Sequence, residues 1–161
     1  MDDQLIEQAE ISFTLNRKPV TRTVPVRRNL VDFLRQDMAL TAAHVGCEAG
    51  VCGACNVRVD GAVVRGCLML AVQVDGLAVD TVEGMSDAGE IAVLQRAFVA
   101  RNAMQCGFCT PGMLMTACEL LARNKCPSRA QIRDAISGNY CRCTGYQAIV
   151  DAIEQAAGDT A

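Results

Sequence analysis

Cysteine is the residue type that carries chemistry in this chain, with ten copies among 161 residues. Thiols at C-x-x-C spacing bind metals as thiolates or, in an oxidising compartment, form disulfides. The sequence opens on the acidic stretch Met1–Gln4, without an apolar segment that could serve as an export signal. We therefore expect a reducing, cytoplasmic environment, and metal ligation in preference to disulfides.

The first cysteine group is a C-x4-C-x2-C run followed later by a fourth cysteine, and it comprises Cys47, Cys52, Cys55 and Cys67. This is the spacing of a plant-type [2Fe–2S] loop. Small residues surround the ligands, namely Gly46, Gly50, Gly53 and Ala54. They would let the backbone wrap closely around an inorganic core. Zinc is the main alternative, but four-cysteine zinc sites usually present two separated C-x2-C pairs, so we favour iron–sulfur.

The second group joins a C-x2-C motif to a C-x-C motif and comprises Cys106, Cys109, Cys141 and Cys143. Each motif precedes a segment with helical periodicity. Helix N-termini present free N–H groups and about half a positive charge, so two of them would suit an anionic, thiolate-bound metal centre. Taken alone, this group leaves zinc open. The two groups together favour an electron path over two structural zinc ions.

Few other residues could do chemistry. The single histidine, His44, excludes a Rieske centre, which needs two, and we expect it to be structural rather than to line the first centre. Cys118 falls on an apolar helix face and Cys126 precedes Pro127 in a turn, so neither is expected to bind metal. No P-loop, dinucleotide, G-x-S-x-G or H-E-x-x-H motif is present. The chain is therefore expected to move electrons and to hold no catalytic residue for a substrate.

Apolar residues in the first part of the chain predict a sheet that supports the first cysteine group. Strands Ile11–Leu15 and Val20–Val26 would pair across the polar turn Asn16–Pro19. Asn29 would then cap a short helix over Leu30–Gln36, with its apolar residues against the sheet.

A second hairpin would deliver the fourth cysteine of this group. Asp60–Gly61 joins residues 56–59 to residues 62–64, which is a strong hairpin signal. Two apolar runs, 68–74 and 77–82, predict a further strand pair. The fold of this part is thus a mixed sheet with one helix.

The composition becomes small and polar at Gly84–Gly89, which predicts a linker and a boundary between domains 1–84 and 85–161. From there the apolar period is helical. Thr110 is expected to cap one helix with Pro111 at its first position, and Ser128 with Gln131 to form a capping box for another. The four predicted helices cover residues 91–98, 110–121, 129–136 and 147–157.

Three segments closely resemble the small iron–sulfur subunit of the xanthine oxidase family of molybdenum hydroxylases, and they are Cys47–Cys55, Gln105–Met113 and Gly138–Tyr146. The resemblance extends over Ile11–Ala156. It implies an α+β chain in which a plant-type ferredoxin-like (β-grasp) domain precedes an all-α four-helix-bundle [2Fe–2S] domain. Lys125 departs from the family, which usually has a proline in that turn.

The resemblance also implies two [2Fe–2S] clusters and their ligands. The distal cluster, nearer the flavin, would be held by Cys47, Cys52, Cys55 and Cys67. The proximal cluster, buried against the molybdenum cofactor, would be held by Cys106, Cys109, Cys141 and Cys143. Gln105 and Cys143 would in addition contact the pterin.

The partners implied are a large molybdopterin-binding subunit, with the cofactor in its cytosine dinucleotide form, and usually a medium FAD-binding subunit, assembled as a dimer of heterotrimers. In this family a water-derived oxygen is added to the substrate at molybdenum, and electrons leave through the proximal and then the distal cluster to FAD, although some members run reductively. A net charge of −3 without a Lys/Arg cluster argues against nucleic acid or an anionic membrane surface. No membrane insertion is expected.

Two other functions are compatible with the cysteines. One is a free-standing two-cluster carrier that docks with several partners, and the other is a structural zinc module. A carrier needs its redox centres near the surface, so a buried second centre would argue against it.

Overall fold

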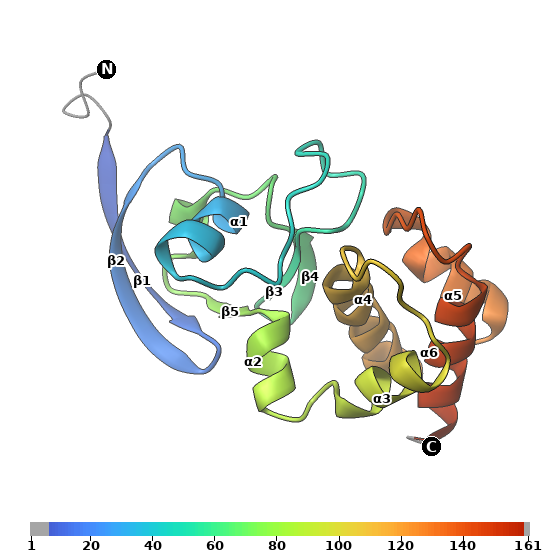
Figure 1. The fold of residues 1–161 in the computed structure, drawn as a ribbon. Coiled ribbons are helices and arrows are strands. Elements are labelled where there is room, and N and C mark those ends of the chain that lie inside the picture. Colours follow the sequence, from blue (N-terminus) through green and yellow to red (C-terminus); the bar gives the residue numbers. More distant parts are fainter. Residues whose placement is uncertain (1–6, 160–161) are drawn as a thin grey trace.

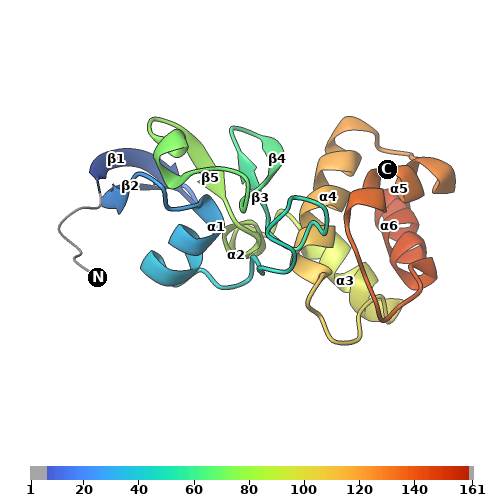
Figure 2. The ribbon, with the colours of Figure 1, turned by 90° about the horizontal axis from the view of Figure 1, so that it is seen from above.

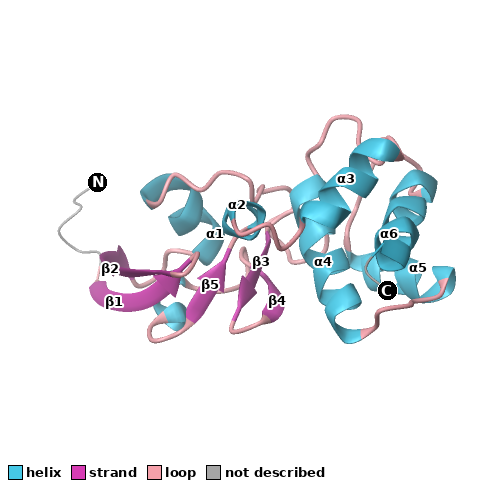
Figure 3. Ribbon diagram, turned by 90° about the horizontal axis from the view of Figure 1, so that it is seen from below, coloured by secondary structure: helices cyan, strands magenta, loops and turns pink. Residues whose placement is uncertain are grey.

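One mixed five-stranded sheet forms the first half of the chain, and helices form the second half (Figures 1 and 3). The computed structural model describes residues 7–159. The strands are β1 Gln8–Leu15, β2 Lys18–Pro25, β3 Asn56–Val59, β4 Ala62–Arg65 and β5 Ala78–Asp80. Their order is β2-β1-β5-β3-β4, and β5 runs parallel to β1 and antiparallel to β3. The last strand in sequence therefore joins the two hairpins.

Both predicted hairpins are confirmed, and the first turn is tighter than expected. Asn16 and Arg17 have φ values of 48° and 66°, so the turn contains only these two residues and Lys18 already belongs to β2. Left-handed backbone at both central positions gives the twist that two-residue hairpins need. Asp60 and Gly61 adopt the same conformation, with φ of 46° and 83°.

The predicted strand over residues 68–74 is wrong. Ala71–Val74 form a 3₁₀ turn, and the side chain of Gln73 accepts the N–H of Leu70 at 2.7 Å. Ala71 and Val74 are the buried residues of this turn, three positions apart, which is the period of a 3₁₀ helix. Of the expected strand pair only β5 exists, and its partners are β1 and β3.

The predicted helix after Asn29 is confirmed. Leu30–Asp32 form α1, which continues as a wider π-helical turn over Phe33–Asp37. The Asn29 side chain accepts the N–H of Asp32 at 2.8 Å, as a cap should. The ring of Phe33 lies 5.9 Å from that of Phe13 on β1, which fixes this helix on the sheet.

The predicted linker is also helical. Val82–Asp87 form α2, and Met85 is the buried residue of this helix. A Cβ at Gly84 would lie 2.2 Å from Oδ1 of Asn16, so this small residue permits close packing on the first hairpin. The small residue Gly84 in this segment therefore allows α2 to pack on the first hairpin, whereas we had interpreted the small residues only as a linker. No helix among residues 7–159 has the length and apolar character needed to cross a bilayer.

Four longer helices make up the second half, namely α3 Ala92–Ala100, α4 Thr110–Arg123, α5 Arg129–Ala135 and α6 Gln147–Asp159. The capping box is confirmed, because Ser128 Oγ accepts the N–H of Gln131 and Gln131 Oε1 accepts that of Ser128. Thr110 is not the cap of α4. Cys109 occupies that position, and the Thr110 hydroxyl is buried without a hydrogen-bond partner.

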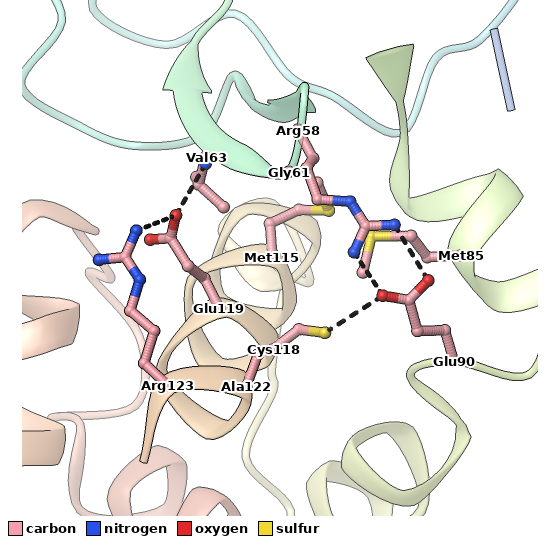
Figure 4. A pocket seen from close by; sticks show the side chains of 10 residues that line it. All are labelled: Arg58, Gly61, Val63, Met85, Glu90, Met115, Cys118, Glu119, Ala122 and Arg123. Carbon is pink, nitrogen blue, oxygen red and sulfur yellow. Dashed lines mark hydrogen bonds and ion pairs between the residues drawn. The ribbon is translucent and has the colours of Figure 1, made fainter. Parts of the chain in front are cut away.

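The two halves meet where the β3–β4 hairpin packs on α4 (Figures 2 and 4). Figure 4 shows Arg58 pointing from β3 to Glu90, which precedes α3, and Glu119 of α4 accepting the N–H of Val63 on β4 at 2.9 Å. Arg58 also pairs with Asp80 at 2.9 Å. The hydrogen bond from Arg58 lowers the pKa of Glu90.

We expect Glu90→Gln to lower the stability of the chain by about 1 kcal/mol, because it removes a charged partner of Arg58 while both side chains keep some contact with water. A carboxyl whose pKa is lowered on folding stabilises the protein above its unfolded pKa, about 4.3, and the contribution is lost as the pH falls through the folded value. Denaturant unfolding at pH 6 and pH 8 should therefore give the same difference between variant and wild type. A difference that changes between these two pH values would contradict the assignment.

A second prediction concerns Gly112, where a Cβ would lie 2.1 Å from the carbonyl oxygen of Gly53. Gly112→Ala should force α4 away from the first cysteine loop and cost about 1–3 kcal/mol, as overpacking does. Gly158→Ala is the matched control, because a Cβ there meets nothing within 4 Å and alanine favours a helix by up to about 1 kcal/mol. Thermal unfolding of the two variants should separate them, and an unchanged midpoint for Gly112→Ala would show that the close approach is unimportant.

Candidate metal centres

The first cysteine loop has no regular secondary structure between Met38 and Cys55, yet its backbone is well anchored. The Arg35 guanidinium donates to the carbonyl oxygen of Ala43 at 2.7 Å. The N–H of His44 donates to Ala54 across the loop at 3.0 Å. A loop without a sheet or helix ladder needs such partners for its peptide groups. The fixed backbone in turn places the cysteines.

The structure brings the four cysteines of the first group together. Cys47 Sγ accepts the N–H groups of Ala49 and Cys52, each at 3.4 Å, and these bonds lower its pKa to about 6. The thiols of Cys47 and Cys52 interact with each other. Cys55 interacts with Cys67 in the same way, and burial raises the pKa of Cys55 to about 11. Cys52 also acts on Cys55, so the four thiols of this group interact with one another.

Glycine is required at two positions of this loop. Gly50 has φ of 76°, and a Cβ there would lie 2.3 Å from Cδ1 of Leu68. Gly53 has φ of 72°, and a Cβ there would lie 2.6 Å from the carbonyl oxygen of Gly138. We predicted small residues as a cradle for an inorganic core. At Gly53 the structure adds a second reason, which is the backbone of the helical half lying against the loop.

The second cysteine group also assembles, from the start of α4 and the loop before α6. Cys106 Sγ lies 3.5 Å from Cys143 Sγ, and both residues are exposed. Cys109 interacts with Cys141, and burial raises the pKa of Cys109 to about 12. Burial acts to raise the pKa of Cys141 as well, but hydrogen bonds with Thr144, Cys143 and Cys109 together outweigh it, and the net shift is downward. The four thiols of this group therefore also interact with one another.

The elements that position the second group are the helix starts that the sequence indicated. Thr110 opens α4 directly after Cys109, and Gln147 opens α6 shortly after Cys143. Between them the N–H of Cys141 donates to the hydroxyl of Tyr146 at 2.8 Å. Tyr146 therefore ties the C-x-C loop to the beginning of α6.

Each group fits a cluster held by four thiolates. Every donor is sulfur, and all eight thiols are free. Among residues 7–159, no three His, Cys, Asp or Glu side chains are arranged to hold one metal ion. A tetrahedral zinc site would need four ligands around one point, whereas a two-iron cluster takes two ligands on each iron. Four cysteine ligands at each site are the number that a two-iron cluster needs.

A buried polar network joins the two sites, and the sequence analysis missed it. Asn56 donates to the Thr116 hydroxyl at 2.9 Å, and Thr116 donates to Asn139 at 3.0 Å. Asn139 in turn donates to the carbonyl oxygen of Gly53 at 3.3 Å. Asn56 and Asn139 are both almost completely buried, and each stands next to a cysteine motif. An asparagine among apolar strand residues was the signal that could have revealed the first of them.

His44 connects the same two loops. Its Nδ1 lies 2.9 Å from the carbonyl oxygen of Phe108, and its ring stacks on the Phe108 ring with centroids 4.5 Å apart. Phe108 lies between the two cysteines of the C-x2-C motif. His44 thus contacts the other cysteine loop, which agrees with a structural role, although nothing in the sequence indicated Phe108 as its partner.

Three candidates from the sequence remain, and two of them, Cys118 and Cys126, are cysteines outside both groups. Cys118 borders a cavity of about 180 Å³ beside Glu90 (Figure 4), and burial raises the pKa of its thiol. Cys126 is exposed between α4 and α5. Gln105, predicted to contact a pterin, is exposed next to Cys106.

Comparison with known proteins identifies both halves. Residues 13–79 match the model of the 2Fe-2S iron-sulfur cluster binding domain, and residues 81–154 match that of the [2Fe-2S] binding domain. The nicotine 6-hydroxylase small subunit of Paenarthrobacter nicotinovorans is 50% identical over 152 residues, which cover 94% of this chain and 92% of the relative.

Two solved structures share the fold. Quinoline 2-oxidoreductase of Pseudomonas putida 86 contains a chain with a TM-score of 0.89 and 48% identity, and the match covers 94% of both chains. The aldehyde oxidoreductase of Desulfovibrio gigas gives a TM-score of 0.86 at 41% identity, with 94% of this chain covered and 17% of that one. This chain therefore belongs to the small iron–sulfur subunits of the xanthine oxidase family of molybdenum hydroxylases, which are electron-transfer subunits without a substrate site.

Proposed function

We propose that this subunit carries electrons between the molybdenum cofactor of a large partner subunit and FAD, or an external acceptor, through two [2Fe–2S] clusters. The observation that carries the proposal is the presence of two groups of four cysteines, whose thiols interact with one another within each group. Two redox centres within one small chain can pass electrons from one partner to another in two steps. The substrate is bound on another polypeptide.

The first group would hold the distal cluster, nearer the flavin, through Cys47, Cys52, Cys55 and Cys67. The second would hold the proximal cluster, nearer the molybdenum, through Cys106, Cys109, Cys141 and Cys143. We assign them to a plant-type ferredoxin-like domain over residues 1–84 and a helical, four-helix-bundle domain over residues 85–161. Each cluster, when bound, would supply a one-electron redox site.

Contacts between the two cysteine loops would fix the two sites relative to each other. Tyr140 donates its N–H to the carbonyl oxygen of Cys52 at 2.8 Å. One hydrogen bond therefore connects a ligand residue of the first group to the neighbour of Cys141, a ligand of the second. With the stack of His44 on Phe108, this contact holds the two sites close together without any motion of a carrier domain.

Exposure at the second site supports a large partner there. Cys106, Cys143 and Gln105 are exposed, whereas Cys55 of the first group is buried. In the proposed complex the partner subunit covers these residues, and Gln105 and Cys143 contact a molybdopterin, which we take to be the cytosine dinucleotide form. A medium FAD-binding subunit and a dimer of heterotrimers complete the proposed assembly.

A free-standing carrier is the second candidate function. A buried second site would have argued against such a carrier. Because Cys106 and Cys143 are exposed, that argument does not apply. The complex is favoured by the nature of the relatives, since the nicotine 6-hydroxylase protein is a small subunit. In the Desulfovibrio gigas aldehyde oxidoreductase the matching fold is one part of a much longer oxidoreductase chain. A fold that occurs fused to such a chain supports a lasting contact with a large partner.

Metal content tests the proposal directly. Material purified through a tag on this chain from its own host should contain about four iron atoms per chain, two for each [2Fe–2S] cluster, and about one molybdenum. Iron without molybdenum, in a chain that purifies alone under conditions that do not dissociate complexes, would favour the free carrier. Zinc in place of iron would overturn both electron-transfer functions.

The ligand assignment is tested by Cys106→Ser. Removal of one thiolate should abolish or strongly perturb one cluster, lowering the iron content toward about half and interrupting reduction of an artificial acceptor by substrate. Cys126→Ser is the matched control, because Cys126 is also exposed but lies in a loop outside both groups. Unchanged iron and turnover in Cys106→Ser would show that the second group is assigned wrongly.

A further inference from the structure

Arg65 is the one side chain of the described residues that donates to both cysteine loops. It ends strand β4, and its Nε donates to the carbonyl oxygen of Gly50 at 3.1 Å, in the first loop. Its Nη2 donates to the carbonyl oxygen of Gly138 at 2.8 Å, ahead of the C-x-C motif. Its Nη1 donates to the side-chain oxygen of Asn56, directly after Cys55. The guanidinium therefore lies between the two sites.

The charge of Arg65 has no counterpart among residues 7–159. All three acceptors are neutral, and none of the ion pairs in the described residues involves Arg65. Arg58 provides the contrast, because it faces α4 from the same hairpin and binds Asp80 and Glu90. A nearby negative charge stabilises a cation that is partly withdrawn from water. The protein supplies one to Arg58 and none to Arg65.

We propose that Arg65 is an electrostatic tuning residue, whose missing counter-charge is that of the two thiolate-ligated clusters. This inference rests on the proposed function. A cluster that accepts one electron becomes more negative by one charge, while the guanidinium stays protonated throughout. Arg65 therefore stabilises the reduced form of each centre and raises both reduction potentials.

The residue type agrees with this role. The three acceptors lie in three different segments, and the planar fork of arginine can bind all of them at once, which a lysine cannot. A neutral side chain could satisfy some of these acceptors but would bring no charge. Arg65 thus combines a positional role, as a clamp between the loops, with an electrostatic one. Only the second role requires a cation.

The experiment compares Arg65→Gln, Arg65→Lys and wild type in the purified complex, by redox titration with EPR detection of each reduced cluster. Arg65→Gln should lower the equilibrium constant for reduction of both clusters about tenfold, which is about 59 mV for a one-electron couple. Arg65→Lys keeps the charge and should stay near the wild-type potentials. Arg22→Gln is the matched control and should leave both potentials unchanged, because it removes the same charge from β2, which lies at the opposite edge of the sheet from β4.

Equal shifts in the glutamine and lysine variants, or no shift in either, would overturn the proposal. If Arg65→Gln loses iron, Arg65→Met is measured in the same way. Loss of iron from both neutral variants, with wild-type potentials in Arg65→Lys, would support a requirement for the charge, whereas loss from all three would assign Arg65 a structural role only. Absence of two cluster signals from the wild-type complex would instead refute the proposed function itself.

Discussion

Direct contact between the two cysteine loops is the constraint on which the rest of this structure depends. The carbonyl oxygens of Cys52 and Gly53 accept hydrogen bonds from Tyr140 and Asn139, so the backbone of the helical half lies against the first loop. Such an approach leaves no room for side chains, and Gly53 and Gly112 provide the space. The sheet part and the helical part are thereby held in a fixed position relative to each other. Electron transfer between two redox centres requires such a fixed distance.

The polar groups at this contact are consistent with its role. Burying asparagine costs free energy unless its hydrogen bonds are made, and Asn56 and Asn139 have partners for both amide and oxygen. Hydrogen bonds are directional, so a satisfied network of this kind fixes one arrangement of the two loops where apolar packing would tolerate several. The apolar cores lie on either side of it, one under the sheet and one among the helices.

The cysteine pattern and the local turn chemistry carried most of what could be predicted from the sequence. Asp60–Gly61, Asn29 and Ser128 each specify their own turn or cap through the neighbouring backbone, so these elements were identified correctly. The segment 68–74 was mistaken for a strand because a short apolar run has no period that separates a strand from a 3₁₀ turn. The partners of Asn139 and His44 could not be predicted, since they come from segments far away in the chain.

The two arginines of the β3–β4 hairpin show how similar residues acquire different roles from their surroundings. Arg58 forms ion pairs with two carboxylates of the protein, Asp80 and Glu90. The pair with Glu90 joins the sheet to the helical part. Arg65 meets only carbonyl and amide oxygens, so its charge remains available to whatever binds between the loops. Neither sequence position nor residue type distinguishes them, since the pattern of the hairpin places both on the side that faces α4. The distinction arises from the acidic residues that the fold brings to one arginine and keeps from the other.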